Sequence, residues 1–455
     1  MKTRMNFKDE FYQKLKLLVL PIAIQNFMLA LVSATDAIML GWIDQTSLSA
    51  VSLAGQVQFV LSLFISGIAA GAGIMAAQYW GKRDAASIEK VIPIALRTNL
   101  LFSGLFTILA GFCPEILMRI FTNDAALVAS GSQYLRAVAL SYVLCGISQV
   151  YLILLKNTGH AAVSSRISST AVVLNIILNA ILIYGLCGAP ALGIRGAAYA
   201  TVAARVVELI WAYLETKKPE RVRILWNRLF SSAGKILSED FWRYTLPVLA
   251  ASLVWGIAYV LYSVIMGHMG SDAVAANSIT SIAKSLLSCL IRGVSGGAGV
   301  LIGNLLGADE LEKAREYGGR LTHLAIAIGV VTGGLLMLIS PAIVHFAPLT
   351  DTAAEYLQYM LLFCGLNLMA QSVNTTVLDG IFCAGGDAKF DMQGNIGAMW
   401  CFSVPLGFLA AFWLKLPVMV VYCIVNLDEI VKLPAVYLHY KKYVWVRNIT
   451  RDIEE

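Results

Sequence analysis

The stretch SGIAAGAGIMAAQYWGKRD (66–84) recurs, with substitutions, as RGVSGGAGVLIGNLLGADE (292–310). The two copies align without a gap, and Gly71 falls on Gly297, 226 positions later. The small residues of both copies suit close packing between helices in a lipid environment. A repeat of this length predicts that the chain folds as two related halves.

The repeat extends beyond these copies, because Pro21 falls on Pro247 at the same offset. One position differs in chemistry: Asp36 in the first half falls on Tyr262 in the second. The two halves are therefore predicted to share a fold but not their chemistry.

The composition is that of a membrane protein. Of 455 residues, 58% are hydrophobic and only 14% are charged, whereas soluble domains carry about 25% charged residues. The apolar runs are long enough to cross a bilayer core of about 30 Å. The first run follows a basic segment but belongs to the repeat, so we expect it to be a retained span and not a signal peptide.

The fold predicted from these runs is an all-α polytopic membrane protein with twelve transmembrane helices in two pseudo-symmetric six-helix lobes, arranged as parallel repeats. The predicted domains are an N-lobe (1–216), a cytoplasmic linker (217–240) and a C-lobe (241–455). The predicted spans are 15–43, 47–80, 91–113, 130–155, 163–187, 191–216, 241–267, 273–306, 318–346, 353–383, 390–414 and 416–440.

Basic residues are distributed as topology signals. Lys and Arg gather in both terminal segments and in the loops that follow the even-numbered spans. This bias predicts that both termini are cytoplasmic. It also accounts for the net charge of +6, so we predict no nucleic-acid partner.

Motifs for covalent chemistry are not found. The eight cysteines show no paired or His-associated spacing, and the sequence has no GxxxxGK[ST], HExxH or GxSxG. We therefore predict that the chain is not an enzyme and has no cofactor. A driving force would come from an ion gradient or from the gradient of the substrate itself.

Asp36 is the first candidate for function. It lies in the apolar stretch FMLALVSATDAIMLG (27–41), close to the outer end of the first span. A carboxylate inside a membrane costs on the order of 3 kcal/mol unless it is hydrated, paired, protonated or bound to a cation. The alternative is a simply hydrated interfacial acid, and a proton- or Na⁺-binding role is favoured because intramembrane acids are commonly functional.

Asn175 and Asn179 lie on one face of a helix in LNIILNAILIYG (174–185). Their amide oxygens could complete a cation site with Asp36, which would make these three residues the Na⁺ ligands if sodium is used. The equal alternative is interhelical hydrogen bonding, worth about 1 kcal/mol. Thr201 is a weaker candidate, because Thr commonly bonds its own helix backbone.

Further polar residues lie around the tenth to twelfth spans. For Asp379, a role in a substrate cavity and a purely structural role are equal alternatives. For Asp391, stabilisation at a helix N-terminus is the favoured interpretation. Asp428, Glu429 and Lys432 have the spacing of a mutual ion pair. The remaining candidates of the second half are Gln371, Asn374 and Asn395.

Aromatic residues could line a cavity for flat cations, although packing in a core or against lipid is the commoner outcome. The candidates are Trp255, Tyr259 and Tyr262. Arg205 is expected to reach from its helix toward a membrane surface.

Several stretches together resemble the multidrug and toxic compound extrusion (MATE) family in a bacterial form. They cover most of residues 11–450 and are DAIMLGWIDQTSLSAVSLA (36–54), GAGIMAAQYWGKRD (71–84), NTGHA (157–161), NIILNAILIYG (175–185), GIRGAAYAT (193–201), TLPVLAASLVWG (245–256) and AGGDAKF (384–390).

The resemblance implies a two-lobed exporter of organic cations or other amphipathic compounds, driven by H⁺ or Na⁺ across the bacterial cytoplasmic membrane. It places Asp36 at the acid tied to cation coupling, with Tyr134, Asn175 and Thr201 at polar positions of the same site. A monomer embedded in lipid is expected.

Three positions depart from the family pattern. Asn179 stands where relatives often have Asp, and Ser252 stands where many have Glu. Asn395 occupies the place of an acid found in the eleventh span of some members. If coupling exists, it should therefore depend on Asp36.

The alternative function is a flippase for lipid-linked precursors from the same superfamily. Such a protein is expected to line its cavity with several Arg or Lys for pyrophosphate. The candidates at bilayer depth here are only Arg292 and Lys284.

Overall fold

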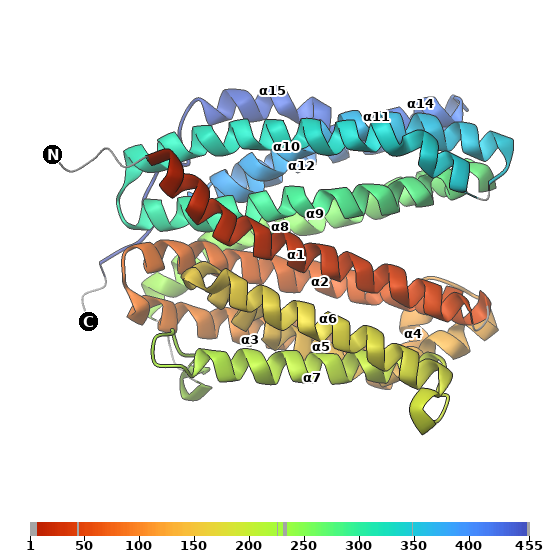
Figure 1. Cartoon of the computed structure of the whole chain (residues 1–455), viewed down its shortest axis with the longest axis horizontal. Coiled ribbons are helices and arrows are strands. Elements are labelled where there is room, and N and C mark those ends of the chain that lie inside the picture. The colour runs from red at the N-terminus through yellow and green to blue at the C-terminus, as the bar shows by residue number, and fades with distance from the viewer. Residues whose placement is uncertain (1–6, 43–44, 225, 231–233, 348, 453–455) are drawn as a thin grey trace. The chain divides into compact units, whose positions relative to one another are not determined.

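The computed structural model describes residues 7–42, 45–224, 226–230, 234–347 and 349–452. These residues form helices, turns and short loops, with no strand among them (Figure 1). The α-helices are α1 (Phe7–Gly41), α2 (Gln45–Gly81), α3 (Ala85–Phe112), α4 (Pro114–Arg119), α5 (Ala125–Leu155), α6 (Ala161–Tyr184), α7 (Ile194–Thr216), α8 (Lys235–Gly267), α9 (Ser271–Gly307), α10 (Leu311–Phe346), α11 (Asp351–Thr375), α12 (Ala388–Asn395), α13 (Val404–Phe408), α14 (Val418–Val425) and α15 (Asp428–Tyr440).

Six shorter segments depart from α-helical winding. Two are 3₁₀ turns, η2 (Leu186–Gly188) and η3 (Trp226–Arg228). The wider π-helical segments, which often mark functional positions, are η1 (Lys156–His160), η4 (Thr376–Phe382), η5 (Ile396–Ser403) and η6 (Leu409–Trp413).

The helices cover eleven of the twelve predicted spans as long apolar segments. Ten helical segments of the described chain are long and apolar enough to cross a membrane. One of them, Ala125–Tyr184, contains both α5 and α6, which a kink at Thr158 and Gly159 separates. The last predicted span, 416–440, is divided into α14 and α15 by a break after Val425. The chain is a multi-pass all-α membrane protein.

The chain divides into two compact units. The N unit is Phe27–Leu249, and the C unit is Met1–Asn26 together with Ala250–Glu455. Helices α1 and α8 therefore each contribute to both units. The predicted domain boundary at 217–240 follows the sequence repeat, whereas the compact units follow the packing of these two long helices.

Close backbone approaches hold the N unit together. α5 packs on α2, α3 and α7, and α6 packs on α7. A Cβ on Gly71 would lie 2.3 Å from the Thr245 hydroxyl oxygen, and one on Gly67 would lie 2.9 Å from Leu249 Cα. The glycines of the repeat thus act here as the predicted packing residues.

The C unit uses the second copy of the repeat in the same way. α9 packs on α10, α11 and η4. A Cβ on Gly293 would lie 2.6 Å from Ala23 Cβ, and one on Gly297 would lie 2.8 Å from Val19 Cγ2. The N-terminal half of α1 therefore packs in the C unit, through contacts at Val19 and Ala23 that only glycine permits on α9.

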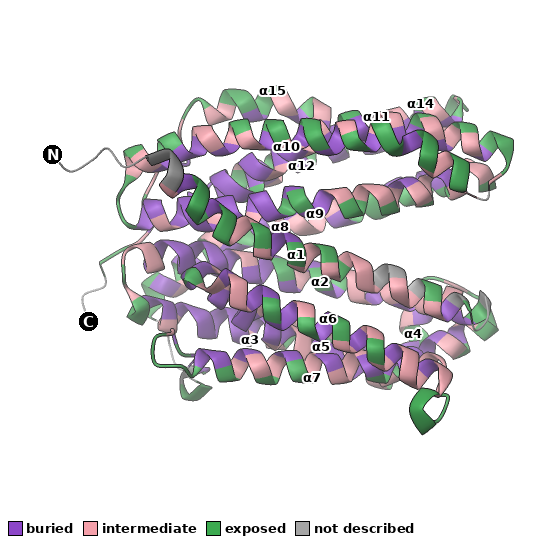
Figure 2. Cartoon of the chain, viewed as in Figure 1, coloured by how far each residue is buried: buried purple, intermediate pink, exposed green. Residues whose placement is uncertain are grey.

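Exposed residues occur along many of the helices (Figure 2), and large apolar residues are among them. Phe112 is 80% exposed, Leu338 78%, Phe346 82% and Trp413 84%. Water would penalise such surfaces, whereas hydrocarbon does not. The exposure pattern is that of helices that face lipid.

Candidate functional site

The N unit brings Asp36 of α1 to the asparagine face of α6. Asn179 Nδ2 donates to Asp36 Oδ1 at 2.5 Å and to Asn175 Oδ1 at 3.3 Å. Asn175 Nδ2 in turn donates to the Thr201 hydroxyl of α7 at 3.3 Å. Four of the predicted residues are thereby joined in one hydrogen-bonded chain across three helices, which we call the Asp36 network.

Thr201 ends this chain in the way expected of a helical threonine. Its hydroxyl donates to the Ala197 carbonyl oxygen, one turn earlier in α7, at 3.0 Å. With its only proton given to the backbone, the hydroxyl receives the Asn175 amide through its oxygen. Donation in the network therefore starts at the Asn179 amide nitrogen, which donates to Asp36 on one side and, through Asn175 and Thr201, toward the backbone of α7 on the other.

Burial is greatest at the two asparagines in the middle of the network, whereas Asp36 and Thr201 at its ends are half-buried. The Asp36 side chain is half-buried, whereas Asn175 is 5% exposed and Asn179 is fully buried. Asn179 Oδ1 is also buried and has no hydrogen-bond partner among the described residues. A buried acceptor without a donor is uncommon, so the network has an unused oxygen beside its only carboxylate.

Tyr134 of α5 lies in the apolar core of the N unit. It is 7% exposed, packs with Leu40, Leu135 and Tyr142, and lies within electrostatic reach of Asp36. No hydrogen bond joins it to the Asp36 network in the described structure. A different tyrosine, Tyr184, fixes α1 against α6 by donating to the Met39 carbonyl oxygen at 2.6 Å.

Two candidates of the C unit, Asn374 and Asn395, form hydrogen bonds with an ion pair in α15. Lys432 Nζ lies 3.2 Å from Glu429 Oε1 and 3.8 Å from Asp428 Oδ2. Asn374 Nδ2 donates to Glu429 Oε2 at 2.8 Å, and Lys432 donates to Asn395 Oδ1 at 3.2 Å. The mutual pairing expected of the α15 charges is present, with amides from α11 and α12 on either side.

Asp391 joins the same group. Asn395 Nδ2 donates to Asp391 Oδ1 at 3.1 Å. Asp391 lies in the first turn of α12, as predicted, but it is 6% exposed and so is a buried group and not an interfacial one. Asp379, in η4, is exposed, and Gln371 is half-buried on α11.

The α8 candidates do not converge on one point. Trp255 and Tyr259 stack on each other, with ring centroids 5.5 Å apart, and Tyr259 is 42% exposed. Tyr262 is buried in the core of the C unit and lies within electrostatic reach of Asp428 and Glu429. Ser252 is half-buried in the same helix.

The prediction for Arg205 was wrong. Its guanidinium does not extend to a membrane surface but pairs with Glu208, with Nη1 2.6 Å from Oε2. Ser148 and Ser168 each donate to the Glu208 carboxylate at 3.3 Å. The sequence signal was the spacing of RVVEL (205–209), in which two opposite charges share a helical face.

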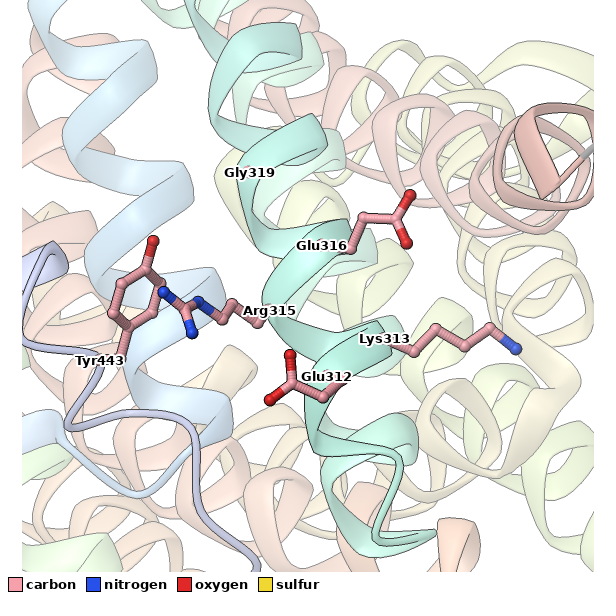
Figure 3. Close-up of a pocket in the computed structure, with 6 residues that line it drawn as sticks. All are labelled: Glu312, Lys313, Arg315, Glu316, Gly319 and Tyr443. Atoms are coloured by element: carbon pink, nitrogen blue, oxygen red, sulfur yellow. The ribbon is translucent and has the colours of Figure 1, made fainter.

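A polar surface depression lies at the start of α10 (Figure 3). The Arg315 guanidinium packs over the Tyr443 ring at 3.9 Å, and the two side chains lie together at one side of the depression. Glu312, Lys313 and Glu316 line the rest. None of the predicted site residues lies there, so we assign it no part in the site.

No group of three His, Cys, Asp or Glu side chains in the described chain is arranged to hold a metal ion. The Asp36 network has one acid, and its other oxygens belong to amides and a hydroxyl. Such a set is suited to one proton or one weakly held monovalent cation, not to a tightly held divalent metal.

Comparison with known proteins gives a consistent picture. The MatE family model matches residues 21–181 and 247–409. The chain is 21% identical to the "Probable multidrug resistance protein YoeA" of Bacillus subtilis, covering 99% of this chain and 98% of that protein. It is also 21% identical to the "Uncharacterized transporter YisQ" of the same organism, covering 94% and 93%.

Solved structures share the fold. One, described as the outward-facing conformation of a multidrug resistance MATE family transporter of the MOP superfamily, aligns with a TM-score of 0.86 and 20% identity over 95% of this chain and 96% of that one. Another, described as a MOP superfamily transporter from Pyrococcus furiosus with a binding pocket of reverse polarity, aligns equally well.

Proposed function

Because the chain belongs to the MatE family of transporters, whose model matches both halves of the repeat, we propose that it is a secondary active exporter. It moves organic cations or other amphipathic small molecules out across the cytoplasmic membrane in exchange for H⁺ or Na⁺. Asp36 is the residue that binds the driving ion. The chain works as a monomer, with both termini in the cytoplasm and without a cofactor.

The observation that carries this proposal is the Asp36–Asn179 hydrogen bond at 2.5 Å. It holds an intramembrane carboxylate against the fully buried amide of Asn179. A change in the charge of Asp36 must therefore change its hydrogen bond with Asn179. Relatives named as probable multidrug resistance proteins support the export of drug-like compounds.

The unused oxygen of Asn179 suggests how Asp36 takes up and releases an ion. In the described arrangement the amide nitrogen faces Asp36, which suits an ionised carboxylate. If Asp36 takes up a proton, rotation of the Asn179 amide presents its oxygen to the new O–H donor. If Asp36 binds Na⁺ instead, the same oxygen becomes a ligand. Because the same Asn179 nitrogen also donates to Asn175 Oδ1, this rotation gives up that hydrogen bond as well.

The lipid-flippase alternative is not favoured by the structure. The two basic residues that could bind a pyrophosphate are Lys284 and Arg292. Lys284 donates to Asn367 Oδ1 at 3.2 Å, so Arg292, which is exposed, is the remaining candidate. A pyrophosphate group would require several unengaged Arg or Lys side chains.

The proposal is tested with everted membrane vesicles and a fluorescent cationic dye. A proton gradient and a Na⁺ gradient are imposed separately on wild type and on Asp36→Asn. We expect one gradient to drive dye uptake in wild type, and we expect uptake to fall more than tenfold in the variant.

Glu312→Gln is the matched control, because it removes an exposed carboxylate of α10 that lines the surface depression and takes no part in the Asp36 network. It should keep wild-type uptake. Gradient-driven uptake at the wild-type rate in Asp36→Asn would reject Asp36 as the coupling residue.

A further inference from the structure

Each half of the chain ends in a similar short sequence. YLETKKPERVR (213–223) follows the last helix of the first half, and YLHYKKYVWVR (437–447) follows that of the second, 224 positions later. The same offset relates RVVEL (205–209) on α7 to EIVKL (429–433) on α15. Six of the eleven positions are identical, whereas only two of the nineteen before them are. The two helix ends are therefore more alike than the helices that carry them, which indicates a role besides spanning the membrane.

The shared residues have the same geometry in both units. In α7 the Lys217 ammonium group lies 4.4 Å from the centre of the Tyr213 ring, and in α15 the Lys441 ammonium group lies 4.4 Å from the centre of the Tyr437 ring. A second lysine follows each of these lysines in the sequence. Because the aromatic ring attracts the first ammonium group, each helix ends in a lysine pair with one member held over a tyrosine.

Each lysine pair continues a stripe of exposed apolar side chains. The stripe of α7 is Val207, Ile210 and Leu214, and the corresponding stripe of α15 is Val431, Pro434 and Leu438. Leu214 is 56% exposed and Leu438 is 63% exposed. Residues three and four apart share one helical face, so each lysine pair lies one turn, about 5 Å, beyond its leucine.

An apolar stripe that leads to two cations matches the chemistry of an anionic phospholipid. The exposed aliphatic side chains suit contact with an acyl chain. Tyrosine is typical of the headgroup level of a membrane, and lysines next to a span attract anionic headgroups. An acyl chain along the stripe would bring the lipid phosphate to the lysine pair.

Simpler roles account for the lysines alone. A lysine at a helix C-terminus is stabilised by the helix dipole, and basic residues beside a span are topology signals. Neither role requires a tyrosine under the first lysine or an exposed leucine one turn before the pair. Both features recur at the same positions of the two units, and a lipid site accounts for them.

The two sites differ in the charge around the lysines. Residues 213–223 include four Lys or Arg and two acids, and Glu215 pairs with Lys218 at 2.8 Å and with Arg221 at 3.1 Å. Residues 437–447 include three Lys or Arg and no acid, because His439 stands in place of Glu215. The neighbouring acid of α12's N-cap, Asp387, pairs with His439 at 2.7 Å. The lysine pair of the C unit therefore carries more uncompensated positive charge.

We propose that the two lysine pairs, Lys217–Lys218 and Lys441–Lys442, each bind the phosphate of an anionic phospholipid whose acyl chain lies along the adjoining stripe. The site of the C unit binds more tightly, because no acid shares its lysines. That the lipid belongs to the cytoplasmic leaflet rests on the topology proposed above. The binding itself requires neither that topology nor Asp36.

The test is native mass spectrometry of the purified full-length protein with phosphatidylglycerol or phosphatidylethanolamine of identical acyl chains. We expect wild type to bind phosphatidylglycerol about fivefold more tightly. Lys441→Gln/Lys442→Gln should weaken this binding roughly threefold, and Lys217→Gln/Lys218→Gln should weaken it less. All four substitutions together should abolish the preference. Asp36→Asn should bind the lipid as wild type does, so failure of the transport proposal leaves this one intact.

Two variants serve as controls. Arg195→Gln/Lys415→Gln removes two exposed cations at the opposite ends of the same two spans and should leave lipid binding unchanged. Lys441→Arg/Lys442→Arg keeps both charges and should keep the binding. Equal affinity of wild type for the two lipids, an undiminished preference in the fourfold variant, or an equal loss in the Arg195/Lys415 control would overturn the proposal. Displacement of the lipid by inorganic phosphate at equal concentration would also overturn it.

Discussion

Asn179 occupies the decisive position of the N unit, because it is fully buried and its amide nitrogen is shared between Asp36 and Asn175. Its spacing from Asn175 and its relation to Asp36 could be predicted from one helical turn and from family resemblance. The unused Oδ1 could not, because it depends on how the amide is oriented by its neighbours. We therefore expect function at this site to depend on the Asn179 amide as much as on the Asp36 carboxylate.

Replacing this amide gives a direct prediction. Asn179→Leu removes the donor to Asp36 while keeping the number and branching of side-chain heavy atoms, and it leaves a carboxylate without its partner. We expect the protein to lose about 1–3 kcal/mol of stability and its ion-driven transport to fall at least tenfold. Thermal unfolding in detergent and vesicle uptake measure the two effects.

Tyr184→Phe is the matched control for this variant. It removes the nearby hydrogen bond to the Met39 carbonyl oxygen, at a cost of about 1 kcal/mol, but leaves the Asp36 network intact. Equal transport losses in the two variants would mean that helix packing, and not the Asn179 amide, explains the first result.

Arg205 and Glu208 show a limit of reading one residue at a time. A lone arginine near a helix end is reasonably expected to reach the membrane surface, but here a glutamate one turn away takes it inward. The comparison of RVVEL with EIVKL would have identified both pairs. It requires an offset of 224 instead of 226, which an ungapped alignment of the halves does not show.

At the scale of elements, the last span and the segment after it were the least predictable. Hydropathy shows one apolar run at 416–440, whereas the structure breaks it into α14 and α15. Nor did the sequence indicate that residues after α15 fold back. Trp445 is fully buried in the core of the C unit, and Arg447 donates to the carbonyl oxygens of Gly385 and Gly386 at 2.7 and 2.6 Å.

The packing of the segment after α15 on Gly385 leaves no room for a side chain at this position. A Cβ there would lie 1.9 Å from the Trp445 carbonyl oxygen, so Gly385→Ala must displace the C-terminal segment. We expect about 2–4 kcal/mol of destabilisation and faster proteolysis after Tyr440. A melting curve together with limited digestion followed by mass spectrometry measures both.

Gly394→Ala provides the comparison, since a Cβ at this position of α12 would have no neighbouring atom within 4 Å and alanine is the better helix former by about 1 kcal/mol. It should be neutral or slightly stabilising. Similar behaviour of the two variants would show that the C-terminal segment does not pack on Gly385 in membranes.

For the whole molecule, the number and apolar character of the spans followed from hydropathy and from the repeat. The division into compact units could not be predicted in this way. It depends on where each end of α1 and of α8 packs, and this packing is set by contacts between residues far apart in the sequence. Residues of α1 up to Asn26 belong with the second half of the chain, and α8 up to Leu249 belongs with the first.

This exchange predicts that the two halves of the chain need each other. If the chain is cut between Pro219 and Glu220, the halves should copurify when coexpressed, and each alone should aggregate. Gly71→Val should reduce copurification, because its Cβ would meet Thr245 at 2.3 Å across the cut chains.

Gly104→Val, on α3 with nothing within 4 Å of its Cβ, should leave copurification unchanged. Affinity purification through a tag on one half, with quantification of the other, gives the result. Two halves that are each monodisperse when expressed alone would contradict the exchanged packing of α1 and α8.

The central claim is that Asp36 binds the ion whose movement drives export. The most direct measurement is made on purified protein in liposomes that enclose a pH-sensitive or Na⁺-sensitive dye, with substrate added on one side. We predict that substrate movement causes counter-movement of one of these ions in wild type, and that Asp36→Asn shows neither movement above protein-free liposomes. Ion counter-movement that persists undiminished in Asp36→Asn would contradict the account.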